Sequence, residues 1–116
     1  MILMYPVISM TDACTHIGSR DNLLGQSPDN KLLQYYSSEL QVKNDTPPTL
    51  LILADDDTAV SAENSIIMYQ TLRKNKIPAE IHIISEGNHG FGLCTNNAHI
   101  ATWTNYMKLW LNSLNK

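Results

Sequence analysis

The stretch that decides the fold is Thr49-Leu50-Leu51-Ile52-Leu53-Ala54, followed at once by Asp55-Asp56-Asp57. Apart from Thr49, the first part is apolar at consecutive positions, so it shows no alternation between apolar and polar residues. Continuous apolar character is typical of a strand buried on both faces, as at the centre of a parallel sheet. Residues Pro47 and Pro48 mark its beginning because proline cannot donate to a strand ladder. The sequence therefore predicts a central parallel strand over residues 49–54.

The remaining elements are expected on both sides of this strand. The patterns predict a strand over residues 1–9 (its apolar run is 1–8), a polar excursion over 10–46 with a helix at 29–40, and then a helix over 61–75, a strand over 79–85 and a helix over 97–115. Residues 47–116 thus read as a βαβα unit, which favours parallel strands with right-handed crossovers. We expect one α/β domain covering residues 1–116, with three mostly parallel strands and flanking helices.

Composition narrows the class of protein. The 116 residues are 43% hydrophobic, with 8 basic and 11 acidic side chains, which predicts a globular domain and gives no indication of nucleic-acid binding. No apolar run is long enough to span a membrane, and Met1 to Met4 lacks the features of a signal peptide, so a cytoplasmic location is expected. The two cysteines, Cys14 and Cys94, fit neither a disulfide framework nor a zinc spacing and are expected to be free.

Potential catalytic side chains follow two of the predicted strands. The run 55–57 comes after one strand, and His89 lies in a glycine-containing loop, 87–92, after the next. Because sites in parallel sheets form outside the carboxyl ends of the strands, these residues are expected at one edge of the sheet. A carboxylate there could orient an imidazole that acts as a base. A solvated loop that caps the following helix, with a histidine of no role, remains an alternative interpretation.

A metal site from His16, His89 and the aspartates is conceivable, but no ligand spacing supports it. We therefore expect no metal and no cofactor.

The order of several segments resembles the C-terminal portion of an α/β-hydrolase of the esterase and acetyl-xylan-esterase-like (dienelactone-hydrolase-like) group. The resemblance covers nearly the whole chain, and its specificity lies in the combination of short motifs. The matching segments are residues 4–9, 16–20, 22–25, 36–37 with 39, 47–49, 54–60, 63–65 and 89–92.

The resemblance implies a role for particular residues. The acid of a Ser-His-Asp triad would be Asp57, three residues before Val60, and the histidine would be His89, in His89-Gly90-Phe91-Gly92. The three strands would be the sixth, seventh and eighth of the family sheet, and the excursion would form part of the substrate-pocket wall. We expect His16 and Phe91 to contact substrate.

The chain departs from the family at the nucleophile. It contains no G-x-S-x-G, and Ser9, which follows the first strand, has no neighbouring glycines to form an elbow. We therefore expect the chain to supply the Asp and His of a serine esterase acting on short acyl esters, possibly those of acetylated sugars, with the nucleophile and oxyanion hole placed before Met1. The alternative is an inert truncated hydrolase or an interaction module. The open edge at residues 1–8 would then pair with the amino-terminal half or with a second copy.

Overall fold

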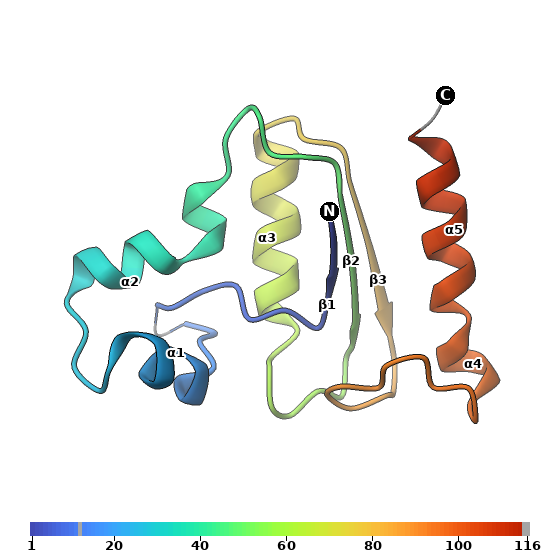
Figure 1. Cartoon of the computed structure of the whole chain (residues 1–116), viewed down its shortest axis with the longest axis horizontal. Coiled ribbons are helices and arrows are strands. Elements are labelled where there is room, and N and C mark those ends of the chain that lie inside the picture. Colours follow the sequence, from blue (N-terminus) through green and yellow to red (C-terminus); the bar gives the residue numbers. More distant parts are fainter. Residues whose placement is uncertain (12, 115–116) are drawn as a thin grey trace.

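The computed structural model describes residues 1–11 and 13–114, which form a three-stranded parallel sheet flanked by helices (Figure 1). The sheet order is β1-β2-β3, in the order of the sequence. The elements are β1 (Ile2–Met4), α1 (Ile17–Leu24), α2 (Asn30–Tyr36), the 3-10 helix η1 (Ser38–Gln41), β2 (Thr49–Ala54), α3 (Glu63–Lys74), β3 (Ala79–Ile84), α4 (Ala98–Ala101) and α5 (Trp103–Ser113).

The central strand β2 has the bounds that the sequence predicts, and all six of its residues are buried. It pairs in parallel with β1, from Ile2 opposite Leu50, and with β3, from Thr49 opposite Ala79. Strands buried on both faces and on both edges need no polar side chains, which explains the continuous apolar run. The three-stranded parallel α/β architecture expected from the sequence is confirmed.

The first strand is shorter than expected. The sequence predicts a strand over residues 1–9, but β1 ends at Met4. Tyr5 adopts a left-handed backbone conformation with φ +37°, although its N–H still donates to the carbonyl of Ile52 at 2.7 Å. Pro6 then follows with no N–H to donate, so the ladder cannot continue.

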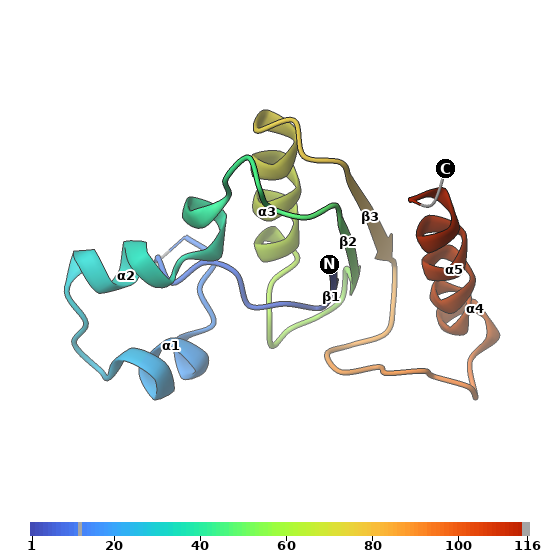
Figure 2. The ribbon, with the colours of Figure 1, turned by 45° about the horizontal axis from the view of Figure 1, so that its top comes forward.

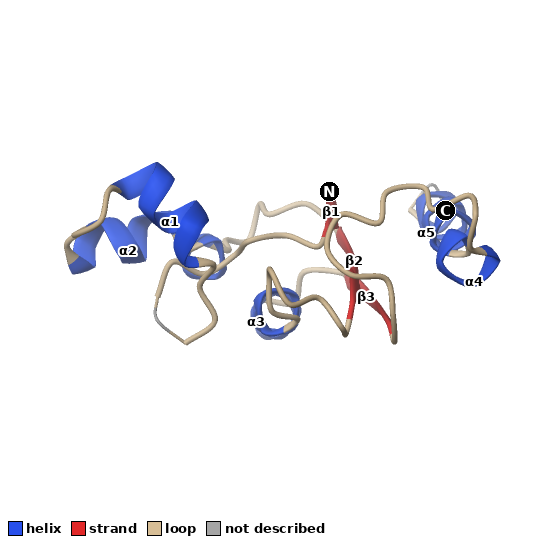
Figure 3. Cartoon of the chain, turned by 90° about the horizontal axis from the view of Figure 1, so that it is seen from below, coloured by secondary structure: helices blue, strands red, loops and turns tan. Residues whose placement is uncertain are grey.

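The two long helices cover opposite faces of the sheet. The residues that pack on the α3 face are Ile8, Leu51, Met68, Leu72 and Ile77, and those on the α5 face are Leu50, Ile52, Ile100, Trp103 and Trp110. Side chains along a strand alternate between faces, so neighbouring residues of β2 belong to different clusters. Figure 3 shows α3 on one side of the strands and α5 beyond β3.

The excursion after β1 forms a separate layer of short helices beside α3 (Figure 2). The helix expected over 29–40 ends at Tyr36 and is followed by the 3-10 helix η1, because the chain turns at Ser37. Its N-cap is Asp29. The apolar side chains of this segment are not covered: Leu32, Tyr36 and Leu40 each have at least 40% of their surface exposed.

The final helical segment is divided in two. The sequence predicts one helix over 97–115, whereas α4 and α5 are separated at Thr102. Asn97 caps α4 through its side-chain oxygen, which accepts from the N–H groups of His99 and Ile100. Residue 115 lies outside the described residues. Within the part of the chain that the structure describes, no helix combines the length and the apolar character that crossing a bilayer requires.

A fully buried asparagine joins the excursion to α3. The Oδ1 of Asn64 accepts from the N–H groups of Ile8 at 2.9 Å and Ser9 at 3.0 Å. Its Nδ2 donates to the carbonyl oxygens of Cys14 at 2.6 Å and Ser61 at 3.3 Å. The side chain therefore satisfies backbone groups that would otherwise be buried without partners.

The helix that carries Asn64 begins later than the sequence predicts. A helix is expected over 61–75, but α3 begins at Glu63, and the hydroxyl of Ser61 donates to the Glu63 carboxylate. The hydrogen bonds from Asn64 to Ile8, Ser9 and Cys14 join residues distant in sequence, so a local pattern cannot predict them.

We expect Asn64→Ala to destabilise the fold, because it leaves two buried N–H groups without an acceptor. The loss in free energy of unfolding should be about 2–5 kcal/mol, measured by urea denaturation. Asn105→Ala, at an exposed position of α5, is the matched control and should be neutral or slightly stabilising. Equal denaturation midpoints for the two variants would contradict this role of Asn64.

Candidate functional site

The candidate site lies where the three parallel strands end. Tyr5 follows β1, the run 55–57 follows β2, and the loop 87–92 follows β3. Since the strands are parallel, these segments meet at one edge of the sheet, which Figure 3 views end-on.

Asp57 is the buried member of the acidic run. Its side chain is 1% exposed, whereas Asp55 and Asp56 are exposed. One carboxylate oxygen, Oδ1, accepts from the N–H groups of Ala59 at 2.9 Å and Val60 at 2.8 Å. The other oxygen, Oδ2, lies 2.7 Å from Nδ1 of His89. The carboxylate is thus fixed by its own loop and directed at the imidazole.

The hydrogen bonds of Asp57 favour its ionised form. Burial alone would raise the pKa of this carboxyl group. The N–H of Val60, the His89 ring and the N–H of Ala59 outweigh that effect and hold the pKa of Asp57 below its ordinary value. An ionised carboxylate can only accept a hydrogen bond. In this contact, therefore, Nδ1 of His89 carries the hydrogen and donates it.

His89 combines a fixed nitrogen with a free one. With Nδ1 bound to Asp57, the unprotonated Nε2 of a neutral ring is the basic nitrogen, and 40% of the side chain is exposed. The loop turns tightly around the ring: Asn88 has φ +57° and Gly90 has φ +75°. A Cβ at Gly87 would lie 3.2 Å from the Cβ of Ala54 and from Cδ1 of Phe91, so those neighbours would have to shift by a few tenths of an ångström.

Two residues that the sequence interpretation did not single out also contact this loop. The ring of Tyr5 packs edge-to-face against His89, with centroids 4.9 Å apart, and against Phe91, at 5.1 Å. Oδ1 of Asp56 accepts from the N–H of Asn88 at 2.8 Å. The position of Tyr5 directly after a parallel strand is a signal that could have placed it at this edge.

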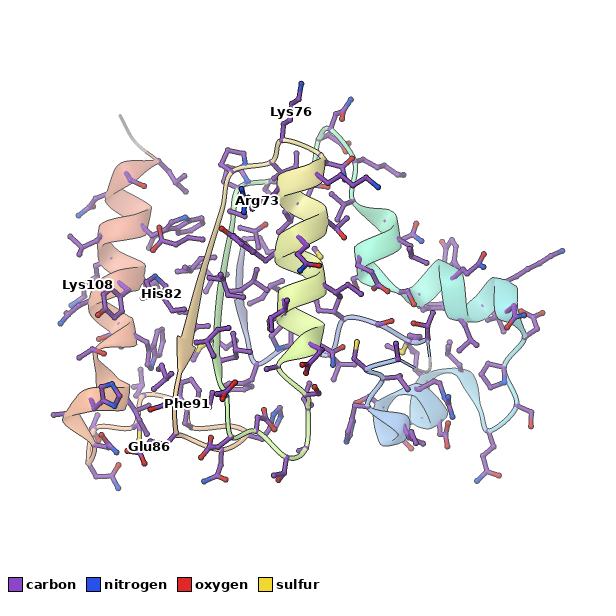
Figure 4. All side chains as sticks on the ribbon, turned by 180° about the vertical axis from the view of Figure 1, so that it is seen from behind. Arg73, Lys76, His82, Glu86, Phe91 and Lys108 are labelled. Atoms are coloured by element: carbon purple, nitrogen blue, oxygen red, sulfur yellow. The ribbon has the colours of Figure 1, made fainter. Side chains whose placement is uncertain are left out.

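The two residues expected to contact substrate lie in different surroundings. Phe91 follows His89 in the loop and is half-buried against the α5 face of the sheet (Figure 4). His16 is the N-cap of α1, where its Nδ1 accepts from the N–H of Ser19 at 3.2 Å. Phe91 is therefore linked to the Asp57–His89 pair by the ring of Tyr5, which contacts both Phe91 and His89. His16 makes a capping contact within its own helix.

Ser9 does not have the exposure of a nucleophile. Its side chain is fully buried, and its hydroxyl lies 2.7 Å from that of Thr11. Its backbone N–H is bound by Asn64. This arrangement agrees with the sequence argument against a nucleophilic elbow at Ser9.

His82 and Cys14 lie in other parts of the fold. His82 stacks on Tyr106 between β3 and α5, with its Nε2 2.5 Å from Glu80 (Figure 4). Both cysteines are free, and burial, with the charges of Glu39 and Glu63, raises the pKa of Cys14. Across residues 1–11 and 13–114, no group of three or more His, Cys, Asp or Glu side chains is placed to hold a metal ion.

Two clefts of the molecule are lined by neither Asp57 nor His89. One, of about 390 Å³, lies between the end of β3 and the helices α4 and α5, and its lining includes His82 and Tyr106. The other, of about 280 Å³, lies between Cys14 and α3. Of the candidate catalytic pair, the Asp57 side chain is 1% exposed and that of His89 is 40% exposed.

Comparison with known proteins identifies the family. Residues 1–114 match the model of the prolyl oligopeptidase family. The chain belongs to the prolyl oligopeptidase family. Its structural neighbours are α/β-hydrolases, which confirms the fold that the sequence resemblance implies.

Curated members of related enzyme groups share more than a third of the residues. The chain is 38% identical over 104 residues to endo-1,4-beta-xylanase B of Butyrivibrio fibrisolvens, covering 90% of this chain and 16% of that protein. It is 39% identical over 98 residues to acetylxylan esterase of Xylanibacter ruminicola, covering 81% of this chain and 20% of that protein. The chain therefore spans a fifth or less of these relatives.

A solved structure extends the likeness. The acetyl ester-xyloside bifunctional hydrolase of Caldicellulosiruptor lactoaceticus is 38% identical, with a TM-score of 0.94 over 98% of this chain and 42% of that one. The chain thus matches less than half of that hydrolase. The comparisons place it among hydrolases of the esterase, acetylxylan-esterase-like type.

The lowered pKa of Asp57 predicts a pH dependence of stability. A carboxylate whose pKa is lower in the folded state stabilises the fold above its unfolded pKa, and that contribution is lost as the pH falls below about 4. We expect the free energy of unfolding in urea to fall more between neutral and acidic pH in the unchanged chain than in Asp57→Asn.

The matched control for this prediction is Asp55→Asn, at an exposed position of the same loop. It should follow the unchanged chain across the pH range. Parallel curves for Asp57→Asn and the unchanged chain would contradict the prediction.

Proposed function

We propose that this chain supplies the Asp57–His89 pair of a serine-dependent ester hydrolase. The observation that carries the proposal is the 2.7 Å contact between Oδ2 of the buried Asp57 carboxylate and Nδ1 of His89, whose side chain is 40% exposed. This is the orientation in which a carboxylate holds the productive histidine tautomer and stabilises its charged form.

In the proposed reaction, Nε2 of His89 takes the proton from a serine hydroxyl. The serine oxygen forms a bond to the acyl carbon of the ester, and the bond from that carbon to the alcohol oxygen breaks as the imidazolium returns the proton to the leaving alcohol. Water then repeats the sequence and releases the acid. Asp57 remains ionised throughout and offsets the charge on the ring. The chain has no G-x-S-x-G, so another segment would provide the serine and the oxyanion donors.

The substrate class follows from the names of the relatives. Those proteins are described as an acetylxylan esterase and an acetyl ester-xyloside hydrolase. We therefore propose short acyl esters, with acetylated sugars as the first choice. His16 and Phe91 are proposed to contact this substrate, with Phe91 already beside the pair through Tyr5.

A chimera tests the proposed reaction. This chain would replace the segment that it matches in the Caldicellulosiruptor lactoaceticus hydrolase, where the two folds agree closely. The chimera should hydrolyse a short-chain aryl ester and be blocked by a serine-directed phosphonate. Asp57→Asn should lower kcat by about 10⁴-fold, and His89→Ala at least as much.

The chain on its own should show no turnover in this assay, because the nucleophile and the oxyanion donors would be absent. His99→Ala, at an exposed position of α4, is the matched control and should keep full activity in the chimera. A chimera that keeps its activity with His89→Ala would disprove the proposal.

A second proposal concerns association through β1, the alternative to catalysis. Within the described residues β1 pairs only with β2, so its other edge is open, and Met1 and Ile2 are about 40% exposed. Open apolar edges associate with further strands. We propose that the isolated chain pairs through β1 with a second copy, unless a hydrolase segment covers this edge.

Size-exclusion chromatography with light scattering tests this association. We expect a dimer at low micromolar concentration, and Ile2→Lys should shift it to the monomer, because a charge on an edge strand opposes pairing. Ile17→Lys, at an exposed apolar position on α1 away from the sheet edge, is the control and should leave the dimer intact. A stable monomer of the unchanged chain would rule out this mode of pairing.

A further inference from the structure

The single hydrogen bond between Asp57 and His89 does not by itself orient the imidazole. A bond along one line leaves the ring free to rotate about that line and leaves the loop free to move with it. The direction of Nε2 depends on the ring plane, and the reaction proposed above requires that direction to be constant. Two contacts outside the pair supply the missing constraints.

The first constraint is the ring of Tyr5. It packs against His89 at an interplanar angle of 66°, and against Phe91 on the same loop at 74°. Edge-to-face contacts of this kind depend on orientation, so they resist rotation of the imidazole. In this position Tyr5 has a left-handed backbone with φ +37°, which is unfavourable for a residue with a large side chain. Its N–H bond to Ile52 anchors that conformation to the central strand.

The second constraint is the carboxylate of Asp56. It accepts from the N–H of Asn88, the residue immediately before His89, at 2.8 Å. Asn88 itself has a left-handed backbone, φ +57°, and the bond fixes this turn to the loop that carries Asp57. Charge-assisted bonds of this type are the stronger class of hydrogen bond. The main chain on the amino-terminal side of His89 is therefore fixed independently of its ring.

We propose that Tyr5 and Asp56 are positioning residues that hold the His89 ring in one orientation against Asp57. Tyr5, which follows β1, restricts the ring plane, and Asp56, which follows β2, restricts the backbone of the loop after β3 that carries His89. The proposal rests on the function proposed above for His89, but the arrangement itself can be tested without catalysis.

Nuclear magnetic resonance of the chain labelled at histidine nitrogen tests the positioning of the ring. The Nδ1–H of His89, bound to Asp57, should give a proton signal that exchanges slowly with water. Nuclear Overhauser effects should connect the rings of Tyr5 and His89. Their absence in the unchanged, folded chain would overturn the role of Tyr5 without any substitution.

Substitution of Tyr5 measures the contribution of its ring. Tyr5→Phe keeps the ring and should leave the Nδ1–H exchange rate unchanged. Tyr5→Leu keeps apolar volume, and Tyr5→Gly suits the left-handed backbone; each should speed exchange by roughly twofold to tenfold. Unchanged amide signals of β2 and α3 show that the variant is folded. Unchanged exchange in whichever of these two variants folds would overturn the role of Tyr5.

Asp56 is tested at an exposed position where the fold is not at risk. Asp56→Ala removes the acceptor for Asn88 and should speed exchange at His89, whereas Asp56→Asn retains an oxygen and should restore much of the protection. Asp55→Ala, the exposed neighbour, is the matched control and should have no effect. Equal exchange rates in Asp56→Ala and Asp55→Ala would overturn the role of Asp56.

Kinetics in the chimera separate this inference from the proposed function. Asp56→Ala should lower kcat with little change in KM, because it alters the orientation of a group used in the transition state. A protected and ordered His89 in an inactive chimera would contradict the proposed function alone. An active chimera in which substitutions at Tyr5 and Asp56 leave the exchange rate of the His89 Nδ1–H unchanged would contradict the positioning role alone.

Discussion

Parallel pairing of β2 with both of its neighbours is the constraint on which the rest of the structure depends. All six residues of the strand are buried, and its ladder partners run in the same direction on each side. Because the strands share a direction, the segments that follow them must leave at the same edge. Tyr5, Asp57 and His89 come from positions far apart in sequence, and this pairing is what makes them neighbours.

At that edge, polar groups are buried only where they have partners. Asp57 is nearly inaccessible to solvent, and its two oxygens are used by Ala59, Val60 and His89. This arrangement explains why the carboxyl group ionises more readily than an ordinary aspartate despite its burial. His89 stays half-exposed, so the same contact that satisfies the carboxylate leaves one ring nitrogen accessible.

The molecule also presents apolar surface that its own elements do not cover. Leu32, Tyr35 and Leu40 are exposed on the excursion, and Leu109 is exposed on α5. Exposed apolar patches of this kind are typical of surfaces that contact other segments or chains.

The sequence by itself determined the central strand, the parallel α/β order, and the placement of Asp57 and His89 at strand ends. These features follow from local patterns, because burial on both faces requires a continuous apolar run and strand ends can be located from it. The motif resemblance then selected Asp57 from the three acidic residues, and in the structure Asp57 is the buried one of the three.

Only the tertiary structure decided what Asn64 binds and which residues surround His89, because both depend on contacts between segments distant in sequence. Asn64 binds the backbone of Ile8 and Ser9, more than fifty residues away. Asp56 accepts a hydrogen bond from Asn88, which lies in another loop. No pattern with the period of a helix or a strand records such contacts.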